Sequence, residues 1–495
     1  MSTAAVEAGD VSGTDYEAVI GLEVHVELAT ASKMFCGCST DFGAPPNTRV
    51  CPVCLGQPGT LPVVNRAAVE SAMRLGLALG CDISASQFHR KHYFYPDMPK
   101  NYQISQYDVP ICAGGALEVP AGQDGNAPVR VGITRVHMEE DTGKSLHVGG
   151  TGRIHGADES LVDYNRAGIP LLEIVSEPDL ATPEQARAYL AELRAVVLAL
   201  GVSDAKLEEG SMRCDANISV NRPGQPPGTR CEIKNLNSLR SLGRALRYEI
   251  DRQIQLREAG QAVVQQTRHW DEAGGATSLL RSKEATEDYR YFPDPDLVPI
   301  EPDAAWIDRL AATLPELPAA ARQRLVAAGV PAEAAGVVVA AHATGVLDDA
   351  LAAGAGPGEA AKWLANDVTG ALGERGLELG EAPLTGAHLA ELLAMVDEGV
   401  LSTKLARQVL EGVLDGQGSP RNIAAAHGLE QISDTDELEA VVEQVIAENA
   451  DAAAKVAEGN DKAIGALVGG VMKATGGQAN PQVVNQLLRE RLQQA

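Results

Sequence analysis

The chain has 495 residues, of which 45% are hydrophobic and 22% charged, and its formal net charge is −26. This balance is typical of soluble globular proteins and excludes a disordered or fibrous chain. A hydrophobic core rarely grows beyond about 250–300 residues, so we expect two or three domains. No apolar run approaches the roughly 20 residues of a membrane span, and the first ten residues do not resemble a signal peptide, so we expect a cytoplasmic protein with no membrane partner.

The first predicted element is a strand, Leu22–Leu28, in which apolar and polar side chains alternate. Side chains point alternately to the two faces of a strand, so Glu23 and His25 share one face while leucines and valines share the other. Three later segments alternate in the same way: Leu171–Glu177, Arg213–Val220 and Arg230–Lys234. This pattern favours an antiparallel sheet with one buried and one open face.

The open faces of these strands carry ligand and catalytic residue types rather than the Lys and Thr of an ordinary solvated face. Contact with water explains any single strand, but the strands together indicate a site. The residues concerned are Glu23, His25, Glu173, Arg213, Asp215 and Lys234. Successive side chains on one face are roughly 6–7 Å apart, so one small cation contacts one or two groups per strand. The run Glu139–Asp141 is a second source of ligands, and mixed carboxylate and imidazole ligands suit Mg²⁺ or Mn²⁺.

Four of the eight cysteines lie in one short segment, residues 36–54, as the pairs Cys36-x-Cys38 and Cys51-x-x-Cys54. Four thiolates in two close pairs predict a closed tetrahedral structural Zn²⁺ site in a protein of a reducing compartment. The alternative is a set of small buried residues or free thiols without a metal.

A zinc-dependent deaminase is a second interpretation of this region. His25–Glu27 and Cys51–Cys54 approach the H-x-E and P-C-x-x-C motifs of those enzymes. However, Val50 stands where the motif has Pro, and Cys36 and Cys38 would fill the position that a catalytic zinc leaves open for water.

Gly143-Lys144-Ser145 resembles the end of a phosphate-binding P-loop, but Met138 stands where that loop needs its first Gly. If the protein uses ATP, another architecture must bind it. The sequence also lacks a Gly-x-Ser-x-Gly nucleophile elbow, and nothing in it suggests an amidase nucleophile.

Two helices are expected between and after the later strands. Thr182, Pro183 and Gln185 form an N-terminal capping pattern, and Gly201 follows the last residue of the apolar period. The second helix is predicted over residues 238–260, where apolar side chains recur at helical spacing.

The composition changes sharply near Phe292, because every Cys, Tyr and Phe lies at or before it. A Pro-rich connector, Pro293–Pro302, marks the change. Beyond it we expect helices, including a capped helix over Ser402–Leu414 and an apolar stripe over Leu438–Ile446, with Gly416–Ala425 as a hinge between them. The sequence therefore predicts an α+β fold with a sheet-based catalytic domain at 1–295, a helical domain at 296–416 and a helical tail domain at 417–495.

The segment Val162–Ile174, VDYNRAGIPLLEI, resembles the signature of one family, the B subunits of the aspartyl/glutamyl-tRNA amidotransferases. The resemblance covers nearly the whole chain and includes long motifs in one order. These motifs are Val19–Leu28, Tyr93–Asp108, His137–Lys144, Leu207–Val220, Cys231–Ser238 and Lys462–Leu488.

The resemblance implies a cradle-shaped, kinase-like domain, a helical domain and a tail that contacts tRNA. It implies ATP-dependent phosphorylation of the side-chain carboxylate of Glu or Asp misacylated onto tRNA(Gln) or tRNA(Asn). Ammonia from the amidase/glutaminase A subunit then displaces the phosphate, in an assembly that also holds the small C subunit. The residues that the family pattern would make ligands of Mg²⁺ and catalytic groups are His25, Glu140 and Glu173, with Glu23 and Glu139 adjacent.

Two further sites are expected, the first from the open strand face and the second from the resemblance. Arg213, Asp215 and Lys234 are expected to bind ATP or the substrate carboxylate, and the four cysteines match a zinc site found in many members. The chain departs from the family pattern by about a dozen extra N-terminal residues and by a Gly-rich insertion, Val148–Gly156, which we expect to be a surface hairpin loop.

An RNA partner needs a local explanation, because a chain of net charge −26 repels nucleic acid at long range. The tail supplies one: residues 461–495 contain two acidic and four basic side chains, and glycine pairs flank Lys473. Close backbone approach to a phosphate is possible there. An ordinary helical cap, and a tRNA-binding scaffold without catalysis, remain the alternatives.

Overall fold

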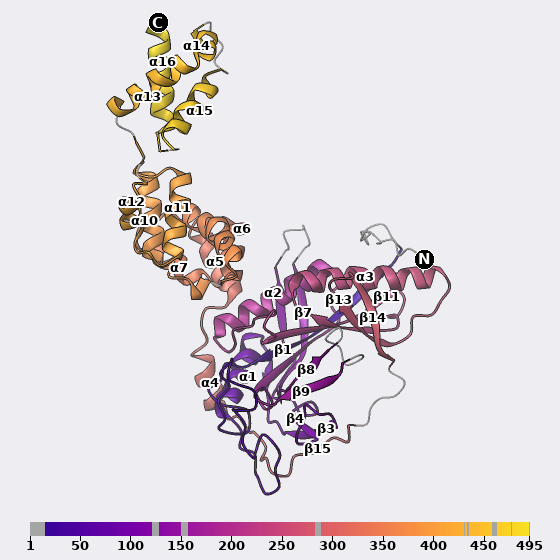
Figure 1. Ribbon diagram of the computed structural model, residues 1–495. Coiled ribbons are helices and arrows are strands. Elements are labelled where there is room, and N and C mark those ends of the chain that lie inside the picture. The colour runs from indigo at the N-terminus through magenta and orange to yellow at the C-terminus, as the bar shows by residue number, and fades with distance from the viewer. Residues whose placement is uncertain are drawn as a thin grey trace. The chain divides into compact units, whose positions relative to one another are not determined.

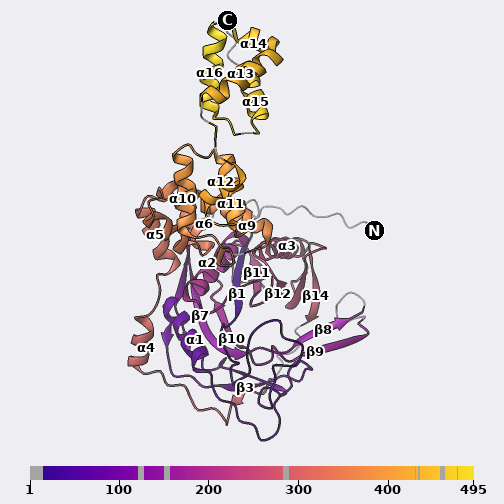
Figure 2. The same cartoon turned by 60° about the vertical axis from the view of Figure 1, so that its left-hand side comes forward.

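The structure is a computed structural model that describes residues 15–120, 128–149, 157–282, 289–377, 379–429, 431–432, 435–457, 463–476 and 478–494. The chain divides into two compact units, Met1–Pro318 and Ala319–Ala495, and each is described by itself (Figures 1 and 2). The extra N-terminal residues before 15, most of the insertion with His155, and Lys462 and Gly477 of the tail lie outside the described residues.

A large sheet forms the centre of the first unit (Figure 1). Its hydrogen-bonded order is β14 (Ala276–Ser282), β13 (Gln266–Asp271), β12 (Cys231–Leu236), β11 (Met212–Asn221), β1 (Glu17–Glu27), β10 (Pro170–Ser176), β7 (Val129–Glu140), β4 (Tyr102–Ser105), β3 (His89–His92) and β15 (Phe292–Pro293). Three short strands attach beside β7: β2 (Asp82–Ile83), β5 (Cys112–Ala113) and β6 (Ala116–Val119). The pairs are antiparallel except β12 with β13, so the predicted antiparallel sheet is confirmed with one parallel exception.

The sheet buries one face and leaves the other open, as the alternation predicted. In β1, Leu22, Val24 and Val26 are fully buried, whereas Glu23 and His25 between them are half-buried. Helices α1 (Arg66–Ala78), α2 (Pro183–Leu200) and α3 (Leu239–Glu258) contribute to the same hydrophobic core as these strands. The polar face is therefore the face that remains for a site.

Both predicted helices are confirmed, the first predicted from its cap and the second from its apolar spacing. Thr182 accepts a hydrogen bond from the backbone N–H of Gln185, and Gly201 ends α2 in the left-handed conformation at φ 63°. Ser238 caps α3 by accepting from the N–H of Ser241. Such caps stabilise a helix by about 1 kcal/mol each, and the buried apolar stripes add the larger contribution.

A separate two-stranded ribbon explains two sequence features. It consists of β8 (Lys144–Val148) and β9 (Glu159–Asp163). Lys144 therefore begins a strand and not the helix that follows a P-loop, which agrees with the rejection of that motif. His147 lies in the ribbon, with its Nδ1 2.8 Å from Ser160 Oγ.

The Pro-rich connector suggested a domain boundary after residue 295. The first compact unit ends later, at Pro318. Helix α4 (Ala304–Ala311) contributes Leu310 to the first core, and Trp306 Nε1 donates to Glu70 Oε1 at 3.0 Å. Because of these contacts, the compact unit continues to Pro318.

The second unit contains helices and two hydrophobic cores. Its helices are α5 (Pro318–Ala327), α6 (Ala332–Ala340), α7 (Thr344–Ala352), α8 (Pro357–Lys362), α9 (Thr369–Arg375), α10 (Gly386–Asp397), α11 (Thr403–Leu414), α12 (Pro420–His427), α13 (Thr435–Glu448), α14 (Ala450–Ala457), α15 (Ile464–Ala474) and α16 (Pro481–Gln494). A π-helical segment, Trp363–Val368, joins α8 to α9, and a 3₁₀ turn spans Leu379–Glu381. None of the described helices is long and apolar enough to cross a membrane.

The predicted hinge at Gly416–Ala425 is wrong. Pro420 occupies the first turn of α12, where a missing N–H costs nothing, and Ile423 and Ala424 are buried in the same core as α10 and α11. The predicted helix after Ser402 and the stripe Leu438–Ile446 are confirmed as α11 and α13. The core of the tail contains α13 to α16, so it begins beyond α12 rather than at residue 417.

Candidate active site and cysteine cluster

Three neighbouring strands place an acidic side chain between two imidazoles. Glu173 on β10 is directly opposite His25 on β1 and His137 on β7. Its Oε2 lies 3.6 Å from His25 Nε2 and 3.6 Å from His137 Nε2. Polar and apolar side chains alternate along each strand, and all three of these residues are at polar positions, so their side chains are on the open face.

Two sets of ligand groups meet at this point. The first set is His137, Glu139 and Glu173, and the second is Glu23, His25 and Asp215. Within each set the ligand atoms lie within 4.8 Å of one another. We call the six residues the carboxylate–histidine cluster. Hard carboxylate oxygens with imidazole nitrogens suit Mg²⁺ or Mn²⁺, so the donor set fits the divalent cations predicted from the sequence.

The predicted ligand Glu140 does not join this cluster. Adjacent residues of a strand point to opposite faces, so Glu139 faces His137 while Glu140 faces away. Glu140 Oε1 accepts from the backbone N–H of Ile104 at 3.0 Å and is ion-paired with Lys100. The structure instead adds His137, which the sequence reasoning missed even though its two-residue spacing from Glu139 is the same signal that identified β1.

Hydrogen bonds hold Glu139 in place. Its two oxygens accept from Ser105 Oγ at 2.9 Å and from Gln103 Nε2 at 2.9 Å, both on β4. His137 Nε2 lies 3.2 Å from Glu139 Oε1. This carboxylate is therefore positioned before any ligand arrives.

Burial and neighbouring charges set the protonation of the cluster. Burial, with the nearby charge of Glu173, raises the pKa of Glu23. Burial opposes ionisation of Glu139, but its hydrogen bond with His137 and the charge of Lys91 lower the pKa overall. Burial alone would lower the pKa of His25, whereas the hydrogen bond and charge of Glu173 raise it. A bound cation would therefore compete with a proton on His25.

Of the three predicted cofactor-binding residues, Asp215 belongs to the cluster, and Arg213 on β11 and Lys234 on β12 lie beside it. Lys234 Nζ is 2.5 Å from Asp215 Oδ2 and 3.0 Å from Glu232 Oε1. Arg213 Nη2 is 2.5 Å from Asp141 Oδ2. We call Arg213 and Lys234 the cationic flank, since both are held by acids at one side of the cluster.

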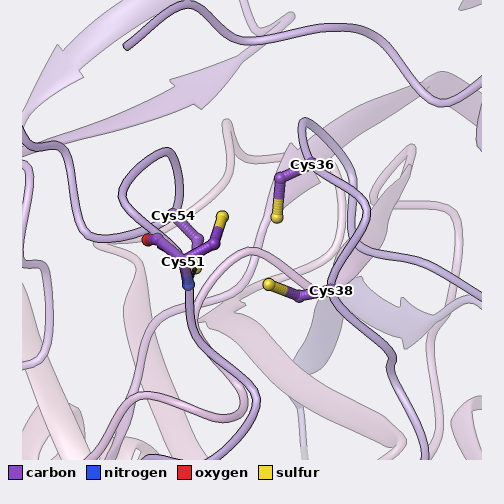
Figure 3. Close-up of side chains that lie close together, drawn as sticks. All are labelled: Cys36, Cys38, Cys51 and Cys54. Carbon is purple, nitrogen blue, oxygen red and sulfur yellow. Dashed lines mark hydrogen bonds between the residues drawn. The ribbon is translucent and has the colours of Figure 1, made fainter. Parts of the chain in front are cut away.

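The four predicted cysteines converge in the loops after β1 (Figure 3). The sulfur atoms of Cys36, Cys38, Cys51 and Cys54 lie within 4.8 Å of one another. A hydrogen bond from Cys36, with the positive charge of Lys33, lowers the pKa of Cys54 to about 5. Four thiols at this spacing fit a tetrahedral zinc site and leave no open coordination position.

The cysteine loop is fastened to the signature segment Val162–Ile174. Asn47 Oδ1 accepts a hydrogen bond from the backbone N–H of Tyr164 at 2.7 Å, and the backbone N–H of Asn47 donates to Asp163 Oδ1 at 2.9 Å. Lys33 is only 1% exposed, and its ammonium donates to Tyr164 O at 3.2 Å and lies 3.8 Å from Cys54 Sγ. The signature therefore connects the cysteine cluster to β10, the strand that carries Glu173.

Comparison with known proteins agrees with this architecture. Residues 18–308 match the family described as the GatB/GatE catalytic domain, and residues 346–492 match the GatB domain. The chain is 57% identical over 486 residues to the B subunit of the aspartyl/glutamyl-tRNA(Asn/Gln) amidotransferase of Thermobifida fusca, covering 96% of this chain and 94% of the relative. The chain belongs to the family of amidotransferase B subunits.

Further relatives in this family cover the chain equally well. The B subunit of Salinispora arenicola is 56% identical over 484 residues, covering 96% of each chain. That of Moorella thermoacetica is 53% identical over 482 residues, covering 97% of this chain and all of the relative. The resemblance drawn from the signature is confirmed, and the deaminase interpretation is not favoured.

The geometry makes Glu139 and Glu140 a matched pair for testing the metal site. Glu139→Gln is expected to weaken Mn²⁺ binding to the full chain at least about tenfold, because it removes a ligand from the cluster. Glu140→Gln should keep Mn²⁺ affinity and lower the melting temperature, since Lys100 loses its buried partner. Calorimetric titration with Mn²⁺ and thermal unfolding measure both. Equal loss of Mn²⁺ affinity in the two variants would place the cation elsewhere.

The cysteine cluster should stabilise the fold. Replacing Cys51 with Ser is expected to remove bound zinc, near one per chain in the wild type, and to lower the melting temperature by about 5 °C or more. Phe42→Ala is the control, because Phe42 lies in the same loop and is 89% exposed. Zinc content by atomic absorption and unfolding with and without a chelator give the result. An unchanged melting temperature in Cys51→Ser contradicts the structural role.

Proposed function

We propose that this chain activates the side-chain carboxylate of Glu or Asp attached to tRNA(Gln) or tRNA(Asn) with ATP and amidates it with ammonia. The observation that carries the proposal is the carboxylate–histidine cluster, in which Glu173 joins two potential cation sites next to the cationic flank. The names of the family's relatives support the substrate class.

The chemistry explains why such a cluster is needed. A carboxylate is a poor electrophile, because its leaving group would be oxide. Attack of a carboxylate oxygen on the γ-phosphorus of ATP breaks the bond to ADP and forms an acyl phosphate. Ammonia then attacks the carbonyl carbon, and phosphate leaves with the electron pair of the broken C–O bond.

Phosphoryl transfer depends mainly on positioning and on neutralisation of charge. The two ligand sets would hold Mg²⁺ or Mn²⁺, which supplies neutralisation of the phosphate oxygens. Arg213 and Lys234 orient the triphosphate or the substrate carboxylate by charge-assisted hydrogen bonds once they exchange their present acidic partners. Ser105 and Gln103 keep Glu139 in place throughout.

Ammonia must come from another protein, because the sequence suggests no amidase nucleophile. We therefore assign glutamine hydrolysis to the A subunit of a cytoplasmic assembly and expect the small C subunit in it as well. A deaminase would need an open zinc position, which four thiols do not leave. A scaffold protein without catalysis would not need the buried acidic residues of the cluster.

The division of labour is directly testable. The purified chain with Mg²⁺ and misacylated tRNA should hydrolyse ATP and form product with high ammonia, but not with glutamine. His25→Ala should reduce tRNA-dependent ATP hydrolysis by about 100-fold or more while the fold survives, because His25 lies on the open face and leaves no core cavity. Glutamine-dependent product from the isolated chain would refute the assignment.

We propose that the tail domain binds tRNA. Its hydrophobic core begins beyond α12, so a truncation that removes only the tail should start after α12. Removing residues 433–495 leaves α12 and its core intact, whereas removal from 417 would delete α12. We expect the truncated chain to bind tRNA several-fold more weakly, with a difference that shrinks as salt rises. Filter binding at several salt concentrations measures this, and Mn²⁺ affinity is the control. Equal tRNA affinity at low salt removes the tail from the RNA interface.

A further inference from the structure

Lys33 lies in the interior of the first unit without an acidic partner. It is only 1% exposed. Lysines are almost never buried completely unless their charge is paired. Among the residues that the structure describes, Lys33 forms no ion pair with a carboxylate. Its buried positive charge therefore needs another negative group nearby.

A comparison with Lys100 shows which kind of partner is missing. The Lys100 side chain is 8% exposed and is paired with Glu140. Lys33 has two polar contacts of another kind, since its Nζ donates to Tyr164 O at 3.2 Å and lies 3.8 Å from Cys54 Sγ. A carbonyl oxygen carries only a partial charge. Of the two contacts, only the sulfur of Cys54 can supply a full negative charge, as a thiolate.

The surroundings of Cys54 suit a negatively charged sulfur. Cys54 is 6% exposed, so its sulfur cannot depend on water for stabilisation. The backbone N–H of Cys51 donates to Cys54 Sγ at 3.2 Å. An N–H donor on one sulfur, together with a nearby ammonium, is the combination that stabilises a thiolate.

The backbone of the signature segment packs against both groups. A Cβ placed on Gly168 would lie 3.5 Å from Lys33 Cδ and 3.7 Å from Cys54 Cβ, which are ordinary contact distances. The carbonyl of Tyr164, in the same segment, accepts from Lys33. Because these contacts keep water away from the two groups, the attraction between ammonium and thiolate is screened less than at the surface.

We propose that Lys33 is the counter-charge of the four-cysteine zinc site and a positioning residue for it. One Zn²⁺ with four thiolates leaves two uncompensated negative charges, and the Lys33 ammonium offsets one of them. Lys33 thereby increases the affinity of the cysteines for zinc and connects the site to Tyr164 of the signature segment. The inference rests on the predicted zinc site and does not depend on the proposed catalytic function.

The first test removes the charge and keeps the apolar stem. Lys33→Met should weaken zinc binding by the full chain about 10- to 100-fold, the usual effect of losing a group that supports metal ligands. Competition between the protein and a chromophoric chelator measures the affinity. Lys91→Met is the matched control, because it removes a half-buried ammonium beside Tyr289 and should leave zinc affinity unchanged. Equal affinity in wild type and Lys33→Met overturns the proposal.

Cobalt shows whether all four sulfurs still bind in the variant. The Co²⁺-substituted Lys33→Met chain should keep the intensity of the thiolate-to-cobalt absorption bands at saturation, while it needs more Co²⁺ to reach saturation. Weaker bands at saturation would mean that Lys33 maintains the shape of the loop rather than its charge balance. That result also overturns the proposal.

Iron substitution tests the charge itself. Fe³⁺ with four thiolates has one uncompensated negative charge, and Fe²⁺ formed by adding one electron has two, so a neighbouring ammonium stabilises the reduced site more. The reduction potential of the iron-substituted chain should therefore be lower in Lys33→Met than in the wild type, and unchanged in Lys91→Met. An unchanged potential in Lys33→Met contradicts a counter-charge.

The outcomes separate this inference from the claims around it. If the wild type binds neither zinc nor cobalt, the predicted zinc site fails and the role of Lys33 fails with it. If the wild type binds both and Lys33→Met binds them equally well, the zinc site remains and only the role of Lys33 is refuted. None of these measurements uses ATP or tRNA, so the proposed function is tested independently.

Discussion

The register of β1, β10 and β7 is the constraint on which the rest of the site depends. Glu173 lies between His25 and His137 only because these three residues are directly opposite one another. A shift of one residue in β10 would present Leu172 or Ile174 to the cluster and turn the carboxylate toward the core. Both of these apolar residues are fully buried, so the hydrophobic core enforces the register and thereby places the ligands.

The same arrangement brings negatively charged carboxylates close together in the sheet. Glu139 and Glu173 are buried, and transferring ionised groups from water costs several kcal/mol each unless partners offset it. Arg135 reaches Glu173 at 3.3 Å, and imidazoles contact both acids. A divalent cation would offset the remaining charge, so binding of the cation and stability of the sheet are linked. The hydrophobic core therefore supports a polar face whose buried negative charge a cation would offset.

Much of this site could be predicted from the sequence, because strand alternation is a local property. It identified Glu23, His25, Glu173 and Asp215, and the cysteine spacing identified the sulfur cluster. The choice between Glu139 and Glu140 was different. Two adjacent acids do not show by themselves which of them points toward the open face. The position of His137, two residues before Glu139, and the pairing of β7 with β4 decide this. Which acid faced the cluster was therefore a question of register, and the motif alone did not answer it.

The compact units and hydrophobic cores end at other positions than the boundaries that the sequence suggests, since these limits depend on tertiary packing. Pro and Gly at 416–420 resemble a linker, yet Pro420 begins a helix because Ile423 has a core to enter. Likewise, α4 follows a Pro-rich connector but belongs to the first unit through Leu310 and Trp306. Local sequence marks where a chain can turn, and only the contacts beyond the turn decide whether a unit ends there.

The part of the signature segment that precedes β10 holds neighbouring elements in place, whereas Glu173 near its end belongs to the cluster itself. Arg166 donates to the carbonyls of Thr142 and Gly143, which follow the acids of β7. Gly168 has φ 88°, and its backbone N–H donates to Asp141 O. Its carbonyl oxygen accepts from the backbone N–H of Met34, the residue after Lys33. The segment thus links the end of β7, the start of the cysteine loop and the start of β10 through backbone hydrogen bonds. Loss of the cysteine cluster would therefore first loosen the start of β10, at Pro170, and would thereby act on the position of Glu173.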